Sequence, residues 1–188
     1  MKKFKCIPFV LLNMILSIEK LKELLNDKNL VENLSEKEKN KEDGASFDVR
    51  IGEIYEFSGE GYLGINERKT PDIKLIGKYE ENKSYKIKLE KGKYYVIKTI
   101  EKVNTPTNLA SKIIPRSTLF RSGIMLLGGF VDPGFKGELT LGLINISNQD
   151  FTIELGSRVA NLVFHKVEGQ TKEYKGNYQG GEMRTDKI

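Results

Sequence analysis

From Ser46 onward the sequence consists of short runs in which apolar and polar residues alternate, and glycine or proline separates many of them. Residues 47–51 (FDVRI) show this alternation, and residues 139–146 (LTLGLINI) repeat it. Such alternation is typical of strands with one buried face, whereas an amphipathic helix repeats its apolar residues every three to four positions. Many short strands with little helix predict a mainly all-β fold, either a sandwich or a jelly roll.

Before these runs the sequence changes its periodicity. Ile18, Leu21 and Leu25 recur at helical spacing, and the preceding Ser17 is a residue type that often caps the start of a helix. Charged residues occupy the positions between them. We therefore predict one short amphipathic helix near the N-terminus.

Three further stretches give local predictions. The charged run at residues 36–43 (EKEKNKED) and the glycine-rich, polar residues 59–70 both predict exposed loops. Residues 85–89 and 94–100 are rich in β-forming residues and flank a turn at Lys91-Gly92. Two such runs across a short glycine turn predict a β-hairpin.

Composition narrows the class of protein. A chain of 188 residues suits one domain with a substantial core, and its 38% hydrophobic and 30% charged residues are ordinary for a soluble protein. The net charge of +5 is spread among interspersed lysines and glutamates, without a basic stripe interleaved with aromatics. This pattern argues against a nucleic-acid partner and fits phosphorylated small molecules better. We find no stretch long enough to span a membrane.

The chain has one cysteine, Cys6, and one histidine, His165. A single chain therefore forms neither a disulfide framework nor a Cys/His zinc site, which excludes the usual zinc-dependent deaminase chemistry unless subunits pool their ligands. A reducing compartment, and hence a cytoplasmic location, is the natural inference. We interpret His165 as structural.

Both ends of the sequence require interpretation. Residues 1–13 place lysines ahead of a short apolar run, as a signal peptide does, but no small-x-small cleavage site follows. An alternative interpretation is that Met14 is the original start and residues 1–13 are an extension. The last fifteen residues lack core-forming side chains, which predicts a mobile tail.

Two segments carry residue types that suit anion binding and proton transfer. Arg116-Ser117-Thr118 follows a proline, and backbone N–H groups at a helix start, two hydroxyls and a guanidinium together suit an anion. The alternative is an ordinary capped helix with Arg121 in a structural salt bridge. Asp132 follows a Gly-Gly pair and precedes Pro-Gly, so it is either a turn aspartate or a carboxylate that activates water.

The order of the sequence motifs is more specific than any one of them. Residues 44–52, 115–121, 129–137, 156–162 and 174–181 resemble, in this order, five motifs of the dUTPase and dCTP deaminase superfamily. The resemblance covers nearly all of the chain from Met14. It implies a distorted β jelly roll, the dUTPase-like β-clip, which assembles as a homotrimer with active sites shared between subunits. It also implies a domain at residues 14–172 and a flexible tail at residues 173–188 that closes over the active site.

The resemblance also implies roles for individual residues. Asp132 contacts the deoxyribose and the attacking water, and Arg121 braces the site, so these two are the predicted catalytic residues. Mg²⁺ is held through the substrate phosphates, without a direct protein ligand. The backbone around residues 127–131 reads the pyrimidine, and Phe135 packs on the sugar. The predicted substrate-binding residues are Arg116, Ser117, Thr118, Gly129, Val131, Phe135, Asn161, Tyr174, Tyr178 and Gln179.

One departure from the family pattern decides the predicted reaction. Deaminase members carry a glutamate at the position of Gly142, and glycine has no group that moves a proton. Glu138 lies about 13 Å away along a strand that rises roughly 3.3 Å per residue, so we do not expect it to substitute. We therefore predict a dUTP diphosphatase. The alternatives are a dCTP deaminase, a bifunctional dCTP deaminase/dUTPase, and a nucleotide-binding protein without catalysis.

Overall fold

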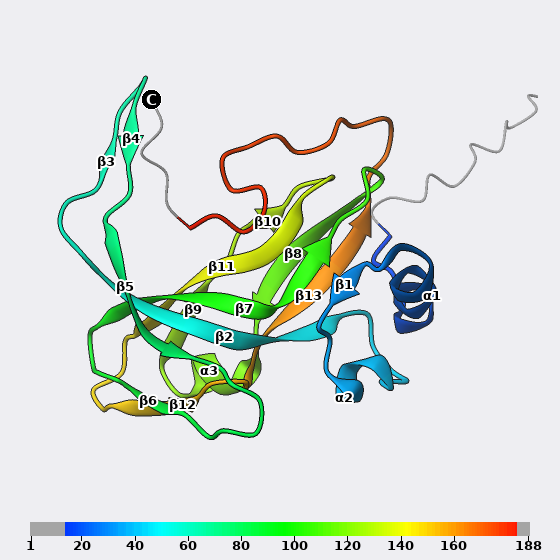
Figure 1. Ribbon diagram of the computed structural model, residues 1–188. Helices are drawn as coiled ribbons and strands as arrows, with labels where there is room; N and C mark the ends of the chain where they lie inside the picture. The colour runs from blue at the N-terminus through cyan, green and yellow to red at the C-terminus, as the bar shows by residue number, and fades with distance from the viewer. Residues whose placement is uncertain (1–13, 184–188) are drawn as a thin grey trace, which may run out of the picture.

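The computed structural model describes residues 14–183, and these form a predominantly β structure (Figure 1), as the sequence predicts. The three helices of this region are α1 (Ile18–Lys28), α2 (Glu36–Lys39) and α3 (Ser117–Arg121). The strands are β1 (Val31–Glu32), β2 (Phe47–Ser58), β3 (Tyr62–Leu63), β4 (Arg68–Lys69), β5 (Asp72–Lys78), β6 (Lys86–Leu89), β7 (Tyr94–Asn104), β8 (Leu109–Pro115), β9 (Ile124–Leu127), β10 (Phe130–Val131), β11 (Lys136–Asn145), β12 (Phe151–Glu154) and β13 (Arg158–Lys166).

Strand β2 joins the two halves of the main sheet. Its first residues pair with β13, and its later residues pair with β7 and β5, with register shifts near the change of partner. The strands along the sheet follow the order β10-β8-β13-β2-β7-β11-β9, and all the pairings are antiparallel. The sheet curls on itself, so that residues from both halves share one hydrophobic core.

The alternation in the sequence places one face of each strand in this core. In β7, every second residue is buried (Tyr95, Ile97, Thr99, Glu101 and Val103), while the residues that alternate with them are only partly covered. In β11, Leu139, Leu141 and Leu143 are buried in the same way. The faces of β7 and β11 that point away from the core therefore remain available to form a site.

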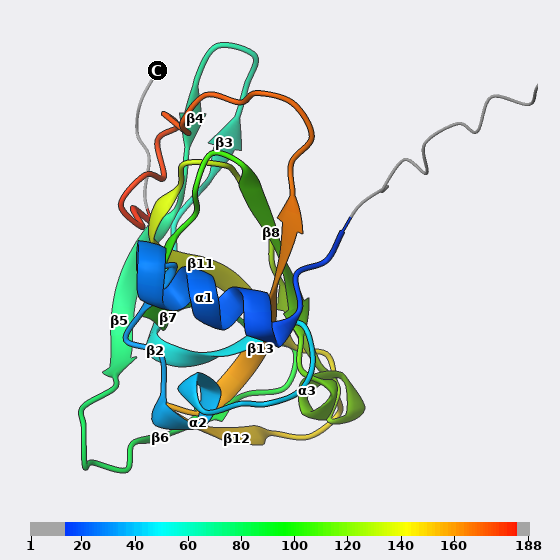
Figure 2. The same ribbon diagram turned by 90° about the vertical axis from the view of Figure 1, so that its right-hand side faces the viewer.

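The predicted N-terminal helix is confirmed. The Ser17 hydroxyl accepts a hydrogen bond from the Lys20 N–H (3.4 Å), and Asn29 ends α1 in the left-handed conformation. Leu21 is fully buried, and α1 lies across the edge of the sheet (Figure 2). His165 pairs with Ile15 as an isolated bridge, which fits its structural interpretation. The interpretations of Cys6 and of residues 1–13 concern positions outside the described residues.

Two local predictions are wrong. Residues 36–43 are not simply an exposed loop, because α2 forms there and its Glu38 is 1% exposed. The predicted hairpin does not form either, since β6 pairs with β12 and β7 pairs with β1, β2 and β11. Residues 59–70 are mostly loop, although they contain the short β3–β4 pair. No helix within residues 14–183 is long and apolar enough to cross a membrane.

Candidate functional site

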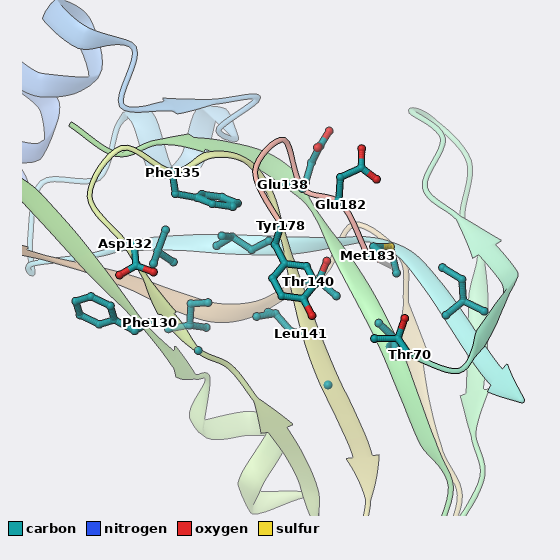
Figure 3. A pocket seen from close by; sticks show the side chains of 18 of the residues that line it. Thr70, Phe130, Asp132, Phe135, Glu138, Thr140, Leu141, Tyr178, Glu182 and Met183 are labelled. Atoms are coloured by element: carbon teal, nitrogen blue, oxygen red, sulfur yellow. The ribbon is translucent and has the colours of Figure 1, made fainter. Parts of the chain in front are cut away.

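A cavity of about 530 Å³ lies between β11, the turn that leads into β10, and residues 173–183, which we call the C-terminal segment. Figure 3 shows Asp132 and Phe130 toward one end of this cavity, Thr70 toward the other, and Thr140 and Tyr178 between them. Much of the wall is apolar and comes from neighbouring strands. The residues that line it are Phe57, Thr70, Pro71, Ile73, Tyr94, Val96, Ile113, Gly129, Phe130, Val131, Asp132, Phe135, Glu138, Leu139, Thr140, Leu141, Gly142, Tyr174, Tyr178, Gly181, Glu182 and Met183.

The cavity follows a part of β11 that lacks a strand partner on one side. Strand β7 pairs along most of β11, whereas β9 pairs only with residues 142–145. Beyond Leu127 the chain leaves β11, because Phe130 and Val131 pair with β8 instead. A strand edge without a partner presents backbone donors and acceptors. This edge and the facing turn can therefore hydrogen-bond the rim of a planar ring.

Two glycines shape that turn. A Cβ atom on Gly128 would lie 2.9 Å from the Ile113 side chain, so only glycine fits without displacing its neighbour. A Cβ atom on Gly129 would meet nothing within 4 Å, and Gly129 lines the cavity. The first glycine therefore brings the turn close to β8, and the second leaves space for a ligand beside the backbone.

Asp132 presents an uncommitted carboxylate to the cavity. Its side chain is exposed and takes part in no hydrogen bond or ion pair with another residue of the described region, 14–183. Its backbone carbonyl accepts a hydrogen bond from the Phe135 N–H (3.2 Å), which closes the turn and fixes the loop. Phe135 is 9% exposed and meets Tyr174 edge to face, with 5.9 Å between ring centroids. Asp132 is thus both a turn residue and a carboxylate available to a ligand.

The C-terminal segment lies on this loop and forms one wall of the cavity. The Tyr174 N–H donates to the Pro133 carbonyl (2.9 Å), and the Gly180 N–H donates to the Lys136 carbonyl (2.8 Å). Gly134 and Gly137 have positive φ, and a Cβ atom on either would collide with the backbone of the segment. Tyr174 also packs against the core, so this part of the tail is better anchored than its composition indicates.

Gln179 holds the segment in place. Its Oε1 accepts from the Lys136 N–H (2.9 Å), and its Nε2 donates to the carbonyls of Gly134 (3.0 Å) and Tyr174 (3.3 Å). Both amide hydrogens are therefore committed to the protein, and in this arrangement Gln179 has none left for the predicted phosphate contact. Tyr178 lies beneath the Arg68 guanidinium, 5.8 Å from ring centroid to Cζ, which links the segment to the β3–β4 hairpin.

The predicted anion-binding residues lie elsewhere on the chain. Arg116 precedes α3 and forms an ion pair with Asp48, and the Arg158 guanidinium lies 3.0 Å from the same carboxylate. Arg158 also contacts the buried Glu38 at 3.1 Å. Arg116 and Thr118 line a second cavity, and α3 lies at the opposite end of the sheet from β10 (Figure 1). A single chain therefore does not bring Arg116 to Asp132.

Three other predicted residues also lie away from the Asp132 cavity. Ser117 is exposed in the first turn of α3, beside Thr118. Arg121 lines a third cavity with residues 147–151. Asn161 lies half-buried in β13, where its Oδ1 accepts from the Ser46 hydroxyl (3.4 Å). Of the predicted residues, the structure brings together Gly129, Val131, Asp132, Phe135, Tyr174 and Tyr178.

The site also contains Tyr94, which the sequence did not indicate. A Cβ atom on Gly142 would overlap the hydroxyl of Tyr94, which reaches over from β7. Glu138 lines the same cavity, and its carboxylate oxygens lie 3.6 Å from the ammonium groups of Lys98 and Lys102. Sequence reasoning missed Tyr94 because the β7–β11 register was not predicted.

Residues 15–167 match the family model described as dCTP deaminase-like. The chain belongs to this family. Relatives in it carry two kinds of name. A probable deoxyuridine 5'-triphosphate nucleotidohydrolase of Methanothermobacter thermautotrophicus is 33% identical over 72% of this chain and 85% of its own length. A dCTP deaminase of Thermococcus kodakarensis is 32% identical over 72% of this chain and 77% of its own length.

Other relatives of the family extend the match. A dUMP-forming dCTP deaminase of Dictyoglomus turgidum is 31% identical over 86% of both chains. The crystal structure of a 2'-deoxycytidine 5'-triphosphate deaminase from Agrobacterium tumefaciens superposes with a TM-score of 0.62 at 16% identity. That match covers 82% of this chain and 49% of the other, and it supports the fold. The family is thus one of enzymes with dUTPase and dCTP deaminase members.

Proposed function

We propose that this protein is a dUTP diphosphatase that converts dUTP and water into dUMP and pyrophosphate. The observation that carries the proposal is the distribution of carboxylates in the cavity. Asp132 is uncommitted, whereas the space above Gly142 is filled by the Tyr94 hydroxyl. The neighbouring Glu138 carboxylate is already paired with two cations of the protein, because its oxygens lie 3.6 Å from the ammonium groups of Lys98 and Lys102.

The cavity suits a pyrimidine deoxynucleotide. The free edge of β11 and the backbone of residues 128–131 face each other at a distance set by the glycine turn, and both offer backbone groups to the rim of a base. Phe135 supplies a flat apolar surface near Asp132 and suits the sugar. A small apolar cavity with a few oriented polar groups is the usual form of a nucleotide-base site.

The phosphate contacts in this proposal come from a second subunit. Arg116, Ser117 and Thr118 lie far from Asp132 within one chain, and the sequence resemblance implies a homotrimer with shared sites. The α3 segment of one subunit would then face the Asp132 cavity of its neighbour. This arrangement accounts for the exposure of Ser117 and Thr118, whose hydroxyls lie on the surface of the single chain.

Magnesium fits as an ion carried by the phosphates. No group of three or more His, Cys, Asp or Glu side chains that could hold a metal occurs within residues 14–183. Mg²⁺ dehydrates reluctantly and commonly keeps several waters when it binds substrate phosphates, so the triphosphate can hold it without a direct protein ligand, and the Asp132 carboxylate stays available to the attacking water. Bound there, the ion would neutralise charge on the phosphate oxygens.

The chemical step assigns the proton to Asp132. A water oxygen attacks the α-phosphorus, a new P–O bond forms, and the bond from the α-phosphorus to the bridging oxygen breaks. The pyrophosphate carries away the bonding electron pair, and Asp132 accepts the proton that the water loses. Arg116 of the neighbouring subunit stabilises the negative charge that develops on the phosphates.

The test measures pyrophosphate and ammonia separately after incubation with dUTP, dCTP or UTP in the presence of Mg²⁺. We expect pyrophosphate from dUTP and no ammonia from dCTP. Asp132→Asn should lower pyrophosphate release by roughly 10²- to 10⁴-fold, because an amide does not accept the proton from water. Asp43→Asn, at an exposed position outside the cavity, is the matched control.

Two results contradict the proposal. Activity of Asp132→Asn above about a tenth of the wild-type rate would remove Asp132 from its role as the base. Ammonia released from dCTP as fast as pyrophosphate from dUTP would establish the deaminase or bifunctional alternative instead. A circular dichroism spectrum verifies that the variant keeps its fold.

A further inference from the structure

Tyr94 reaches the base end of the cavity from the strand next to β11. In the register of the two strands, Gly142 lies opposite Val96, and Ile144 lies opposite Tyr94. Side chains two residues apart share a face, so Tyr94 reaches diagonally over Gly142. Any side chain at position 142 would overlap its hydroxyl. The glycine therefore makes the space that the Tyr94 hydroxyl occupies.

The ring of Tyr94 is held while its hydroxyl faces the cavity. Phe57 meets it edge to face, with 5.1 Å between centroids and 69° between the ring planes. Tyr94 is half-buried, and both Tyr94 and Gly142 line the cavity. Gly142 also pairs with Leu127, the residue that leads into the Gly128-Gly129 turn. The hydroxyl thus lies beside the backbone expected to bind the base.

The proton of this hydroxyl has no acceptor among the residues that the structure describes. Over residues 14–183, no hydrogen bond links Tyr94 Oη to another group. Burial raises the pKa of Tyr94, so the phenol stays protonated at physiological pH. The neighbouring Tyr95 differs, because it lies in the core and its oxygen accepts from the Glu90 N–H (3.0 Å). Tyr94 is therefore the tyrosine of this pair with a donor available to a ligand.

We propose that Tyr94 is a specificity-determining residue whose O–H donates a hydrogen bond to a ring carbonyl of the bound base, and so selects carbonyl-bearing over amino-bearing pyrimidines. The proposal rests on the proposed function for the identity of the ligand as a pyrimidine nucleotide. It assigns to this chain a side-chain contact in addition to those of the backbone turn.

The selection follows from the hydrogen-bonding capacity of the two bases. A carbonyl accepts the Tyr94 proton, whereas an amino group offers only donors to it. The phenol oxygen can accept from an amino group only by turning its own proton away, where the described residues offer no acceptor. Leaving a buried donor unsatisfied is costly, and we expect this hydroxyl to contribute a preference of roughly 3- to 10-fold.

The experiment compares Tyr94→Phe with Tyr95→Phe in the full-length protein. Calorimetry with non-hydrolysable α,β-imido analogues of dUTP and dCTP measures binding without turnover. Tyr94→Phe should weaken binding of the dUTP analogue by roughly 3- to 10-fold and change binding of the dCTP analogue by less than about twofold. Its melting temperature should stay the same, since the ring contact with Phe57 remains.

Tyr95→Phe should behave in the opposite way. It removes the acceptor of the Glu90 N–H, so the melting temperature should fall while the ratio of the two binding constants stays unchanged. This variant separates loss of a structural hydroxyl from loss of a ligand contact.

The possible outcomes each decide the assignment. Equal weakening of both analogues by Tyr94→Phe, or no weakening of either, would overturn it, and so would a wild-type protein that binds neither analogue. A wild-type protein that prefers the dUTP analogue, loses this preference in Tyr94→Phe and yet releases no pyrophosphate from dUTP would support the tyrosine contact and refute the proposed reaction. The two proposals can therefore fail separately.

Discussion

Replacing Gln179 tests whether the C-terminal segment is held by specific contacts. Gln179 makes three hydrogen bonds to the backbone, to Lys136, Gly134 and Tyr174. A hydrogen bond contributes roughly 0.5–1.5 kcal/mol net, so its loss in Gln179→Ala should destabilise the docked segment by about 2 kcal/mol at this half-exposed position. Since 1.4 kcal/mol is a factor of ten, opening of the segment should become about 30-fold more favourable.

A second variant sharpens the prediction. In Gln179→Glu the carboxylate still accepts from the Lys136 N–H, but its other oxygen faces the carbonyls of Gly134 and Tyr174. Three acceptors then face one another without a proton between them. Gln179→Glu should therefore release the segment at least as much as Gln179→Ala above the pKa of the new carboxyl group.

Hydrogen exchange of the Gly180 amide measures the effect. This N–H donates to the Lys136 carbonyl (2.8 Å) only while the segment is docked. Its exchange should accelerate about 30-fold in Gln179→Ala and stay unchanged in Gln170→Ala, a control at an exposed position just before the segment. Acceleration below about threefold in Gln179→Ala would mean that other contacts, such as Tyr174 on Phe135, hold the segment, and would refute the reasoning.

Two further predictions concern the ion pair of the core and the length of the tail. Burial raises the pKa of Glu101 even though Arg50 lowers it, so the folded protein holds a proton that the unfolded chain releases near the usual value of 4.5. The free energy of unfolding should therefore fall as the pH rises from 4.5 through the raised pKa of Glu101. Urea titrations at several pH values measure this dependence, which should disappear in Glu101→Gln. Ending the chain after Tyr174 should leave the melting temperature nearly unchanged, because Tyr174 itself still packs against the core. The turnover of dUTP should fall strongly, because one wall of the cavity is lost. Normal turnover of dUTP would exclude a role for that wall.

Features set by neighbouring residues were predictable from the sequence. The start of α1 was predictable because the N-cap residue Ser17 and the apolar residues Ile18 and Leu21 all lie within about one helical turn of one another. Likewise, Gly129, Val131, Asp132 and Phe135 lie within seven consecutive residues of the chain, so their presence in one cavity follows from their order.

Features set by distant residues were not predictable in this way. Glu38 is buried because Arg158 and the Asp48 N–H satisfy its carboxylate, and Arg158 lies 120 residues further along the chain. Strand β6 pairs with β12 rather than with the adjacent β7, a choice that depends on the global fold. Tyr94 reaches the cavity through the β7–β11 register, which no local pattern encodes.

The separation of Arg116 from Asp132 gives a test of site sharing. If each site takes Asp132 from one subunit and Arg116 from the next, Asp132→Asn and Arg116→Ala are each inactive for a different reason. A mixed trimer then contains sites in which an intact Asp132 faces an intact Arg116. With random mixing in equal amounts, about a quarter of the sites should be of this kind, since each of the two positions is intact with a probability of about one half.

The experiment coexpresses the two variants with different affinity tags and purifies the mixed assemblies. Each mixed trimer has one intact site of three, so the purified preparation should recover about a third of the wild-type rate of dUTP hydrolysis. If both residues acted within one subunit, no site would carry both, and the mixture would stay as inactive as its parents. Arg116 lies with α3 at the far end of the sheet from β10. To bring Arg116 to Asp132 within one chain, a whole strand end would have to move. Association of rigid subunits, in contrast, leaves the Arg116–Asp48 and Arg158–Asp48 contacts in place. Recovered activity would therefore establish that a site combines Asp132 of one subunit with Arg116 of another.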